Sequence, residues 1–319
     1  MEDMSKTKNQ LEQIFVYLTL RCNAQCITCY MYKHYSTIKE MSFEMAKDVL
    51  KKYHSLGAKK LTLLGGEPTL HPHLEELVEF AKNTGYLYVR IQTNGQFDSK
   101  ILTSPLIQKN VDTFSFSMDG HTEDLNHKIR RGCSLNKALE NLRLAEQLGY
   151  DIRVNVTVTS INIVHIFDII ALAENNDVSM IYLNIVFPMG AASSQSYLAV
   201  SPEQWINVFN KIRENSHKFK VRVKVPVGYA SYYLVEHHCI AFEINRLYVM
   251  PNSDAYPCIL FVDNTKLRLD EDPYYDKLTN RVKVSSGKMN SYCHFIRFQG
   301  NKLKHLCVYY RKIFGGGKQ

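Results

Sequence analysis

The chain has 319 residues, 45% of them hydrophobic and 22% charged, which is typical of a globular protein with one large domain and a smaller appendage. It contains no run of about 18 apolar residues and its first residues are polar, so neither a membrane span nor a secretory signal is expected. Eight cysteines are too sparse for a disulfide scaffold in a chain of this length. We therefore expect a cytoplasmic protein whose cysteines serve metal or redox chemistry.

The formal net charge of +8 is concentrated near the C-terminus, where residues 261–319 hold 12 Lys and Arg against 5 Asp and Glu. Such a basic region could attract nucleic acid, an acidic peptide or an anionic cofactor, or it could offset the charge of thiolate-bound clusters. No RNA- or DNA-binding signature supports the first option. We expect neither nucleic acid nor a membrane as a partner.

Most of the chain alternates between short β-rich runs and segments with a helical period. The β-rich runs are residues 14–20, 59–66, 88–95, 112–120, 152–160 and 180–187. Three helical segments, residues 43–57, 73–85 and 135–149, each end on glycine, which is common just after the last helical turn. A further helix is predicted to begin at Ser201, with Pro202 in its first turn and Gln204 completing a capping box.

Six strand-helix units in series predict a parallel sheet that is either doubly wound or curled into a full or partial barrel. Beyond residue 225 the helical period disappears, and short strands, aromatic residues and scattered cysteines and histidines follow. We place a domain boundary there, which gives domains of residues 12–225 and 226–314.

Three cysteines lie directly after the first predicted strand, in the stretch RCNAQCITCY. Other polar candidates also follow strands, and in barrels of this kind such loops converge on one site. Cys22, Cys26 and Cys29 can hold three irons of a four-iron four-sulfur cluster, which leaves one iron open to a chelating ligand such as an amino acid. A structural zinc site is the alternative, but it needs a fourth ligand at short spacing, for which His34 is the nearest candidate.

The CxxxCxxC spacing, the GGEP sequence after the second predicted strand and the alternating layout together resemble the radical S-adenosylmethionine (radical SAM) enzymes. The resemblance covers residues 12–225 and implies an α/β fold, a partial (β/α)6 barrel. It also implies that a [4Fe–4S] cluster on the three cysteines reductively cleaves S-adenosylmethionine. The resulting 5′-deoxyadenosyl radical would abstract hydrogen from a substrate.

The residues that would hold the methionine part of this cofactor come from two loops. Gly65 and Gly66 would let the backbone approach it, because a side chain would fill the space. Glu67 or the neighbouring carbonyls would accept hydrogen bonds from its ammonium group. Arg130 would pair with its carboxylate as a forked donor, and Arg131 is the alternative one residue on.

The nucleoside part of the cofactor would meet the cysteine segment and the later strands. Thr28 stands where the family often has an aromatic residue, with Tyr30 just after the third cysteine, and the backbone there would meet the adenine. The polar residues expected to line the same pocket are Asn94, which is a turn residue first, Ser117, Asn155, and Asp119, which could instead cap the following turn. Cys133 is predicted to be a structural thiol that could also return a hydrogen atom to a substrate radical.

The second region resembles the SPASM or twitch domain of radical enzymes, a smaller α+β cluster domain, and the segment FPMGAASS matches the join to it. Residues 239–258 contain a predicted β-hairpin in which Asn252 and Ser253 replace the usual aspartate and glycine of the turn. Tyr310 and Phe314 stand near positions where cysteines would be expected, so we expect one auxiliary iron-sulfur cluster rather than two. Its candidate ligands are Cys239, Cys258, Cys293 and Cys307, with His237, His238 and His294 as substitutes. The last two cysteines could instead be buried apolar thiols.

Relatives with SPASM-like domains often modify ribosomally made peptides, and the basic C-terminal region could receive an acidic leader segment. We expect a peptide substrate that undergoes cross-linking, oxidation or epimerisation. The alternative is a small molecule in a molybdopterin-like or modified-haem pathway, and a non-catalytic iron-sulfur redox sensor is a remote one. Because 21 residues precede Cys22, we expect no fused recognition domain, so a separate recognition protein or direct binding would serve. An electron donor such as flavodoxin or ferredoxin is also implied.

Overall fold

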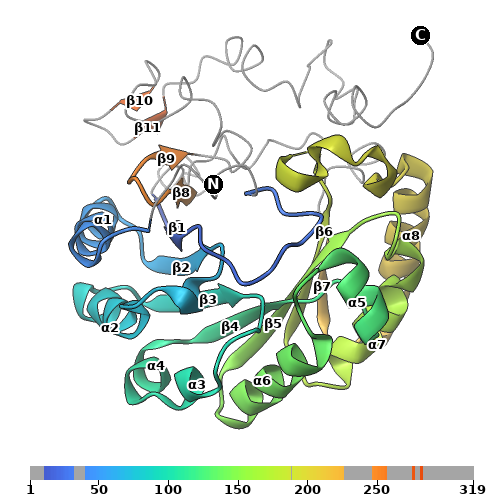
Figure 1. Cartoon of the computed structure of the whole chain (residues 1–319), viewed down its shortest axis with the longest axis horizontal. Helices are drawn as coiled ribbons and strands as arrows, with labels where there is room; N and C mark the ends of the chain where they lie inside the picture. Colours follow the sequence, from blue (N-terminus) through green and yellow to red (C-terminus); the bar gives the residue numbers. More distant parts are fainter. Residues whose placement is uncertain are drawn as a thin grey trace, which may run out of the picture.

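The protein is described by a computed structural model that covers residues 11–31, 40–187, 189–225, 246–256, 275–276 and 281–282. Within these residues a curved parallel sheet carries helices on its outer, convex side, as Figure 1 shows. The strand order is β7-β6-β5-β4-β3-β2-β1-β8-β9, in which every neighbouring pair is parallel except β8 and β9. The six predicted strand-helix units are present, which confirms the predicted α/β fold.

The elements follow one another in regular alternation. Those of the first four units are β1 (Gln13–Thr19), α1 (Phe43–Ser55), β2 (Lys60–Gly65), α2 (Leu74–Thr84), β3 (Tyr88–Thr93), α3 (Lys100–Thr103), α4 (Pro105–Asn110), β4 (Thr113–Ser117), α5 (Glu123–Ile129) and α6 (Leu135–Gln147). The remaining ones are β5 (Asp151–Val158), α7 (Ile166–Glu174), β6 (Met180–Ile185), α8 (Pro202–Asn215), β7 (Arg222–Lys224), β8 (Arg246–Val249), β9 (Ala255–Tyr256), β10 (Tyr275–Asp276) and β11 (Arg281–Val282).

Local sequence signals explain where several helices begin and end. The Ser201 hydroxyl accepts from the Gln204 N–H, and the Gln204 side chain accepts from the Ser201 N–H, which confirms the predicted capping box. Thr122, rather than Asp119, caps α5 with its side-chain oxygen. Gly85 ends α2 in the left-handed conformation at φ 113°, where glycine avoids a Cβ clash.

The core lies between the sheet and the helices. In α2 the buried residues recur at the spacing of one helix face, and they are Leu74, Leu77, Val78 and Ala81. Some strands are buried on both faces, such as β2, where four consecutive residues from Leu61 to Leu64 are buried, whereas buried and partly exposed residues alternate in β5. Each large aliphatic side chain removed from water in this way contributes about 1.5–3 kcal/mol. The sheet is therefore a rigid support for the loops at its strand ends.

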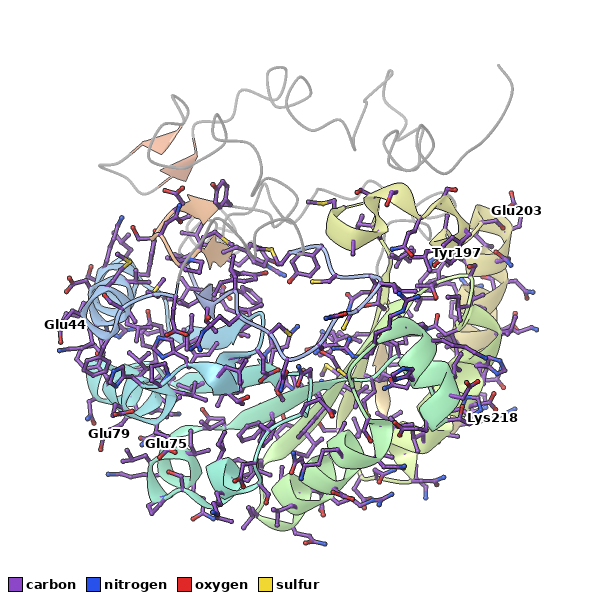
Figure 2. The ribbon with its side chains drawn as sticks, viewed as in Figure 1. Glu44, Glu75, Glu79, Tyr197, Glu203 and Lys218 are labelled. Atoms are coloured by element: carbon purple, nitrogen blue, oxygen red, sulfur yellow. The ribbon has the colours of Figure 1, made fainter. Side chains whose placement is uncertain are left out.

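Charged side chains cover the outside of the helical layer. Figure 2 labels Glu44 of α1, Glu75 and Glu79 of α2, and Glu203 and Lys218 on the opposite side of the molecule, and these side chains point away from the sheet. Among the described residues, no helix combines the length and hydrophobicity needed to cross a membrane.

The sheet continues beyond the first predicted domain. β8 pairs in parallel with β1, and the rings of Phe15 and Tyr248 stack there with centroids 4.7 Å apart. β8 and β9 form the predicted hairpin, whose turn has Ser253 at φ 69° and the Asn252 Oδ1 accepting from the Asp254 N–H at 3.1 Å. The start of the second predicted domain thus joins the edge of the barrel sheet, while the boundary at residue 225 stays a prediction.

Replacing Ser253 by glycine is expected to raise the free energy of unfolding by about 0.5–1 kcal/mol, because glycine avoids the steric cost of the left-handed conformation. Urea unfolding followed by circular dichroism measures the change. Asn252→Gly is the matched control one position earlier, where φ is not positive and a side-chain hydrogen bond is lost, so stability should fall. Equal destabilisation by both substitutions would contradict this account of the turn.

Candidate cluster and cofactor site

The three cysteines lie in a loop directly after β1, residues 21–31, called the cysteine loop below. Cys22, Cys26 and Cys29 are not in disulfide bonds and are partly exposed. The other two thiols act electrostatically on Cys22, so the three lie near one another. The Cys29 N–H donates to the Cys26 carbonyl at 3.1 Å, which forms a tight turn between the second and third thiols. The CxxxCxxC spacing therefore gathers three sulfur donors on one loop.

Segments that follow three other strands hold the cysteine loop through hydrogen bonds. These bonds run from Asn23 Nδ2 to the Gln96 carbonyl (2.7 Å), from the Gln25 N–H to the Arg131 carbonyl (2.8 Å), from the Ile27 N–H to the Ile129 carbonyl (3.0 Å), and from the Ala191 N–H to the Cys29 carbonyl (2.8 Å). A loop without regular structure thus satisfies its backbone groups through its neighbours. The positions of the thiols are consequently set by several strand ends at once.

The GGEP segment at the end of β2 contacts the beginning of the cysteine loop. The Gly66 N–H donates to the Thr19 carbonyl at 2.7 Å, and the Glu67 N–H donates to the Arg21 carbonyl at 2.8 Å. A Cβ added to Gly65 would lie 2.1 Å from the Thr19 carbonyl oxygen, and one added to Gly66 would lie 2.2 Å from that of Arg21. The close approach of another protein loop is thus one reason for glycine at both positions. Their contact with the methionine part of a cofactor stays a prediction.

Glu67 is fully buried and joins the loops that follow β2 and β3. Its Oε1 accepts from the Thr69 N–H (3.2 Å), the Thr69 hydroxyl (2.8 Å) and the Thr93 hydroxyl (2.8 Å), and its Oε2 accepts from the Asn94 N–H (2.7 Å). Burial raises the pKa of Glu67, while these hydrogen bonds act in the opposite direction. The carboxyl group therefore ties protein loops together, and its contact with a cofactor ammonium group stays a prediction.

Asn94 is a turn residue, as predicted, and it also reaches the cysteine loop. Its Oδ1 accepts from the Gln96 N–H at 2.8 Å, which closes a turn of the kind that asparagine favours. Its Nδ2 donates to Asn23 Oδ1 at 2.7 Å and lies 3.8 Å from Cys22 Sγ. A hydrogen-bond donor at this sulfur stabilises negative charge on it.

A buried ion pair lies beside Cys26. Arg130 Nη1 donates to Asp119 Oδ2 at 3.2 Å, and the two side chains are 12% and 0% exposed. Burial raises the pKa of Asp119, and the Arg130 charge and a hydrogen bond from the Thr157 N–H oppose that shift. Arg131 is exposed and contributes only its carbonyl to the cysteine loop. Of the two candidate arginines, Arg130 is the one that faces the thiols.

The thiol of Cys133 is buried and hydrogen-bonded to that of Cys26. This bond and the nearby Arg130 charge lower the pKa of Cys26 to about 6. The same bond and burial raise the pKa of Cys133. Burial raises the pKa of Cys22 to about 11. Cys133 thus lies next to a predicted cluster ligand, and its role as a hydrogen donor stays a prediction.

Ser117, the last residue of β4, is the direct register partner of Asn155, which lies three residues before the end of β5, and both are partly exposed. The Asn155 Nδ2 donates to Ser115 Oγ at 2.7 Å on the same face of the sheet. Thr28, in the cysteine loop, is 8% exposed. The contact of these three residues with a cofactor stays a prediction.

Tyr30 packs beneath the β8–β9 hairpin. Its hydroxyl lies 2.9 Å from the hydroxyl of Tyr17, and its ring packs against a buried cluster that includes Met250 and Tyr256. Burial raises the pKa of both tyrosines, so they are neutral at physiological pH. The hairpin therefore stabilises the end of the cysteine loop, and contact between Tyr30 and a cofactor stays a prediction.

The segment after β6 covers the cysteine loop, which the sequence analysis did not anticipate. This segment, the short 3-10 helix η4 (Gly190–Ser194), begins at Gly190, where φ is 56° and an added Cβ would lie 2.2 Å from the Cys29 carbonyl oxygen. The Gln195 Nε2 donates to the Ile27 carbonyl at 3.1 Å. The glycine in FPMGAASS was the available signal, because only glycine allows two backbones to approach so closely.

The predicted auxiliary site lies outside the described residues. This applies to Cys239, Cys258, Cys293 and Cys307, to the substitute ligands His237, His238 and His294, to the zinc candidate His34, and to Tyr310 and Phe314. The auxiliary cluster therefore stays a prediction.

Residues 16–173 match the Radical SAM superfamily. Residues 16–173 form a radical SAM domain. A probable GTP 3′,8-cyclase of Saccharolobus solfataricus is 30% identical over 181 residues, which span 56% of this chain and 58% of that protein. A GTP 3′,8-cyclase of Lactiplantibacillus plantarum is 24% identical over 291 residues, 83% of this chain and 85% of that protein. Among solved structures, anSMEcpe with bound AdoMet and a peptide has a TM-score of 0.68 at 17% identity, covering 95% of this chain and 94% of its own, a likeness in fold.

The described residues of this radical SAM protein fit the cofactors of the superfamily, a [4Fe–4S] cluster and S-adenosylmethionine. Three thiols converge on one loop, which suits a cluster with one open iron. The cationic Arg130 acts on Cys26, and the amide of Asn94 lies beside Cys22. Both groups favour the negatively charged thiolates that such a cluster needs.

Replacing Gly190 by alanine is expected to destabilise the protein by about 1–3 kcal/mol more than replacing Gly149, because the new methyl group overlaps the Cys29 carbonyl. Gly149 is the matched control, since its φ is also positive, at 87°, but an added Cβ meets nothing within 4 Å. Urea unfolding and iron content after anaerobic reconstitution measure the two effects. Iron content equal in the two variants would show that η4 does not position the cysteine loop.

In iron-free, reduced protein, Cys26 is expected to be alkylated faster than Cys22 at pH 7. The thiolate is the nucleophile, and it predominates at a pH above the pKa of the thiol. That pKa is about 6 for Cys26 and about 11 for Cys22. Mass spectrometry after brief iodoacetamide treatment measures each site between pH 5 and 9. Arg130→Gln should move the Cys26 midpoint upward, whereas Arg131→Gln should leave it in place. An equal shift in both variants would contradict the placement of Arg130.

Proposed function

We propose that this radical SAM protein reductively cleaves S-adenosylmethionine and abstracts hydrogen from a peptide substrate during peptide maturation. The observation that carries the first part is the convergence of Cys22, Cys26 and Cys29 on a loop held by the ends of several parallel strands. A non-catalytic sensor has no need for polar side chains converging around such a loop.

A [4Fe–4S] cluster with bound S-adenosylmethionine supplies a 5′-deoxyadenosyl radical, which removes hydrogen from the substrate. Cys22, Cys26 and Cys29 would hold the cluster, and Arg130 and Asn94 would stabilise charge on its thiolates. A reduced cluster carries one more negative charge, so these two groups also favour its reduction. A flavodoxin or ferredoxin would supply the electron.

The loop contacts also serve to exclude water. The backbone of the cysteine loop is covered by η4 on one side, and its end packs against the buried cluster under the β8–β9 hairpin. Exclusion of water protects a carbon radical from side reactions and strengthens the electrostatic effect of nearby charges. Cys133, buried next to Cys26, is placed near this region and would act as a hydrogen donor to a substrate radical.

The peptide is favoured as the substrate because the fold likeness to anSMEcpe, a protein solved with a bound peptide, extends over 95% of this chain. An auxiliary cluster on Cys239, Cys258, Cys293 and Cys307 would accept the electron that remains after bond formation. The basic residues 261–319 would attract an acidic leader, either directly or together with a recognition protein.

A nucleotide is the second candidate substrate. The match to a relative named GTP 3′,8-cyclase extends over 83% of this chain, which favours a purine nucleotide over other small molecules. The basic region would then serve to bind triphosphate rather than an acidic peptide.

Anaerobically reconstituted protein with a one-electron reductant is expected to convert S-adenosylmethionine into 5′-deoxyadenosine and methionine. Iron content should be about eight per chain with an auxiliary cluster and about four without one, because each cluster holds four irons. Replacement of Cys22, Cys26 and Cys29 by alanine should remove about four irons and all cleavage. Liquid chromatography with mass spectrometry measures the products, and cleavage that persists in the triple variant would overturn the proposal.

The same assay separates the two substrates. GTP and a synthetic peptide with an acidic leader segment are added in separate reactions. A peptide product that loses hydrogen in step with 5′-deoxyadenosine supports the first candidate. Consumption of GTP in step with 5′-deoxyadenosine, with the peptide unchanged, supports the second and overturns the first.

A further inference from the structure

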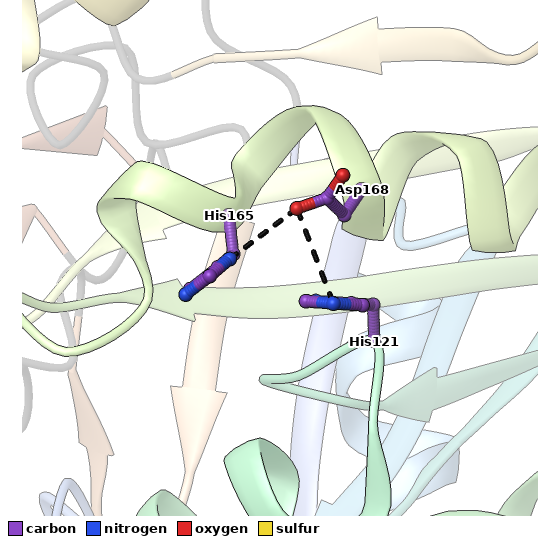
Figure 3. Close-up of side chains that lie close together, drawn as sticks. All are labelled: His121, His165 and Asp168. Atoms are coloured by element: carbon purple, nitrogen blue, oxygen red, sulfur yellow. Dashed lines mark hydrogen bonds and ion pairs between the residues drawn. The ribbon is translucent and has the colours of Figure 1, made fainter.

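Two histidines and an aspartate from the segments that follow β4 and β5 meet at one place. His121 lies in the loop between β4 and α5, His165 ends the short 3-10 helix η3 (Ile163–His165), and Asp168 lies in the first turn of α7. One nitrogen or oxygen from each lies within 4.8 Å of those of the other two. Figure 3 shows the three side chains turned toward one another, and they are called the rim triad below.

A salt bridge explains part of the rim triad but not all of it. His165 Nδ1 lies 3.3 Å from Asp168 Oδ2, a spacing that a weak hydrogen bond allows. His121 Nε2 lies 4.0 Å from the same oxygen, which is too long for one. The other nitrogen of His121, Nδ1, is buried and has no hydrogen-bond partner among the described residues. Protein hydrogen bonds therefore do not account for the position of the His121 ring.

A divalent cation bound to His121 Nε2, His165 Nδ1 and Asp168 Oδ2 would hold the three side chains together. An ion about 2.1 Å from each of two ligand atoms in tetrahedral geometry separates them by about 3.4 Å. The observed separations from Asp168 Oδ2 are 3.3 Å and 4.0 Å, and the two histidine nitrogens lie within 4.8 Å of each other, so binding an ion requires His121 to move inward. The side chains of His121, His165 and Asp168 are 27%, 42% and 56% exposed, which leaves room for water at the remaining coordination positions.

We propose that the rim triad binds one divalent first-row transition-metal ion, of the class of Zn²⁺. Two imidazoles and one carboxylate suit such an ion, whereas Mg²⁺ and Ca²⁺ prefer oxygen ligands. The site is distinct from the cysteine loop in both residues and donor type. The proposal is independent of the substrate and of the activity assigned above.

The place of the rim triad in the fold gives the ion a bracing role. Asp119, which pairs with Arg130, precedes His121 by two residues in the same loop. Asn162, three residues before His165, donates through Nδ2 to the Asp119 carbonyl at 2.9 Å. An ion on the rim triad would therefore fasten together the two loops that position the Asp119–Arg130 pair.

Co²⁺ alone is the probe, because it replaces Zn²⁺ and absorbs visible light. The full chain is first reconstituted with iron and sulfide, so that its cluster cysteines are occupied, and is then dialysed against Co²⁺. We expect the wild type to bind one Co²⁺ more per chain than His121→Ala or His165→Ala, or to bind it at least about tenfold more tightly. His127→Ala is the matched control, since His127 is an exposed histidine on the neighbouring α5, and it should bind as the wild type does.

Asp168→Asn keeps the size of an exposed side chain and guards against loss of the fold in the histidine variants. It should also lose the additional Co²⁺, while its cluster absorption and melting temperature without Co²⁺ match the wild type. The lost absorption should lack thiolate charge-transfer bands, since the rim triad has no sulfur. Equal stoichiometry and affinity in the wild type and all three variants would overturn the proposal, as would equal loss in His127→Ala.

Discussion

Two short backbone contacts, from Gly66 N–H to the Thr19 carbonyl and from Glu67 N–H to the Arg21 carbonyl, join the end of β2 to the start of the cysteine loop. They require glycine at 65 and 66, because any side chain would overlap the carbonyls. The direction in which the chain leaves β1 is thereby fixed before the first thiol is reached. The hydrogen bonds to the segments after β3, β4 and β6 then hold a loop whose starting direction is already determined.

Buried carboxyl groups do a second kind of positioning at the same end of the sheet. Glu67 joins the loops after β2 and β3, and Asp119 joins β4 to β5 and to Arg130. Removing such groups from water is costly, and each is offset by several hydrogen bonds or a cation. Because an unpaired partner would be left in a dry environment, these contacts resist small displacements of the loops. The loops that surround the cysteine loop are therefore held firmly near Glu67 and near Asp119.

The sequence allowed much of this arrangement to be predicted, since local signals dominate it. The strand and helix alternation, the capping box at Ser201 and the hairpin turn at Ser253 depend on residues within a few positions of one another. Other features depend on distant segments, and no local pattern reports them. Which of Arg130 and Arg131 faces the thiols depends on the direction of the chain after α5. Whether η4 covers Cys29 depends on the path of the chain after β6.

The pairing of β8 with β1 has a consequence for biosynthesis. β1 is made early, yet one of its two edges is covered only when residues 246–249 arrive. At typical ribosomal rates the interval is about 10–50 seconds, during which an apolar strand and the adjoining thiols have an open edge. The edge of the nine-stranded sheet beside the cysteine loop is therefore the last part of that sheet to be completed during synthesis.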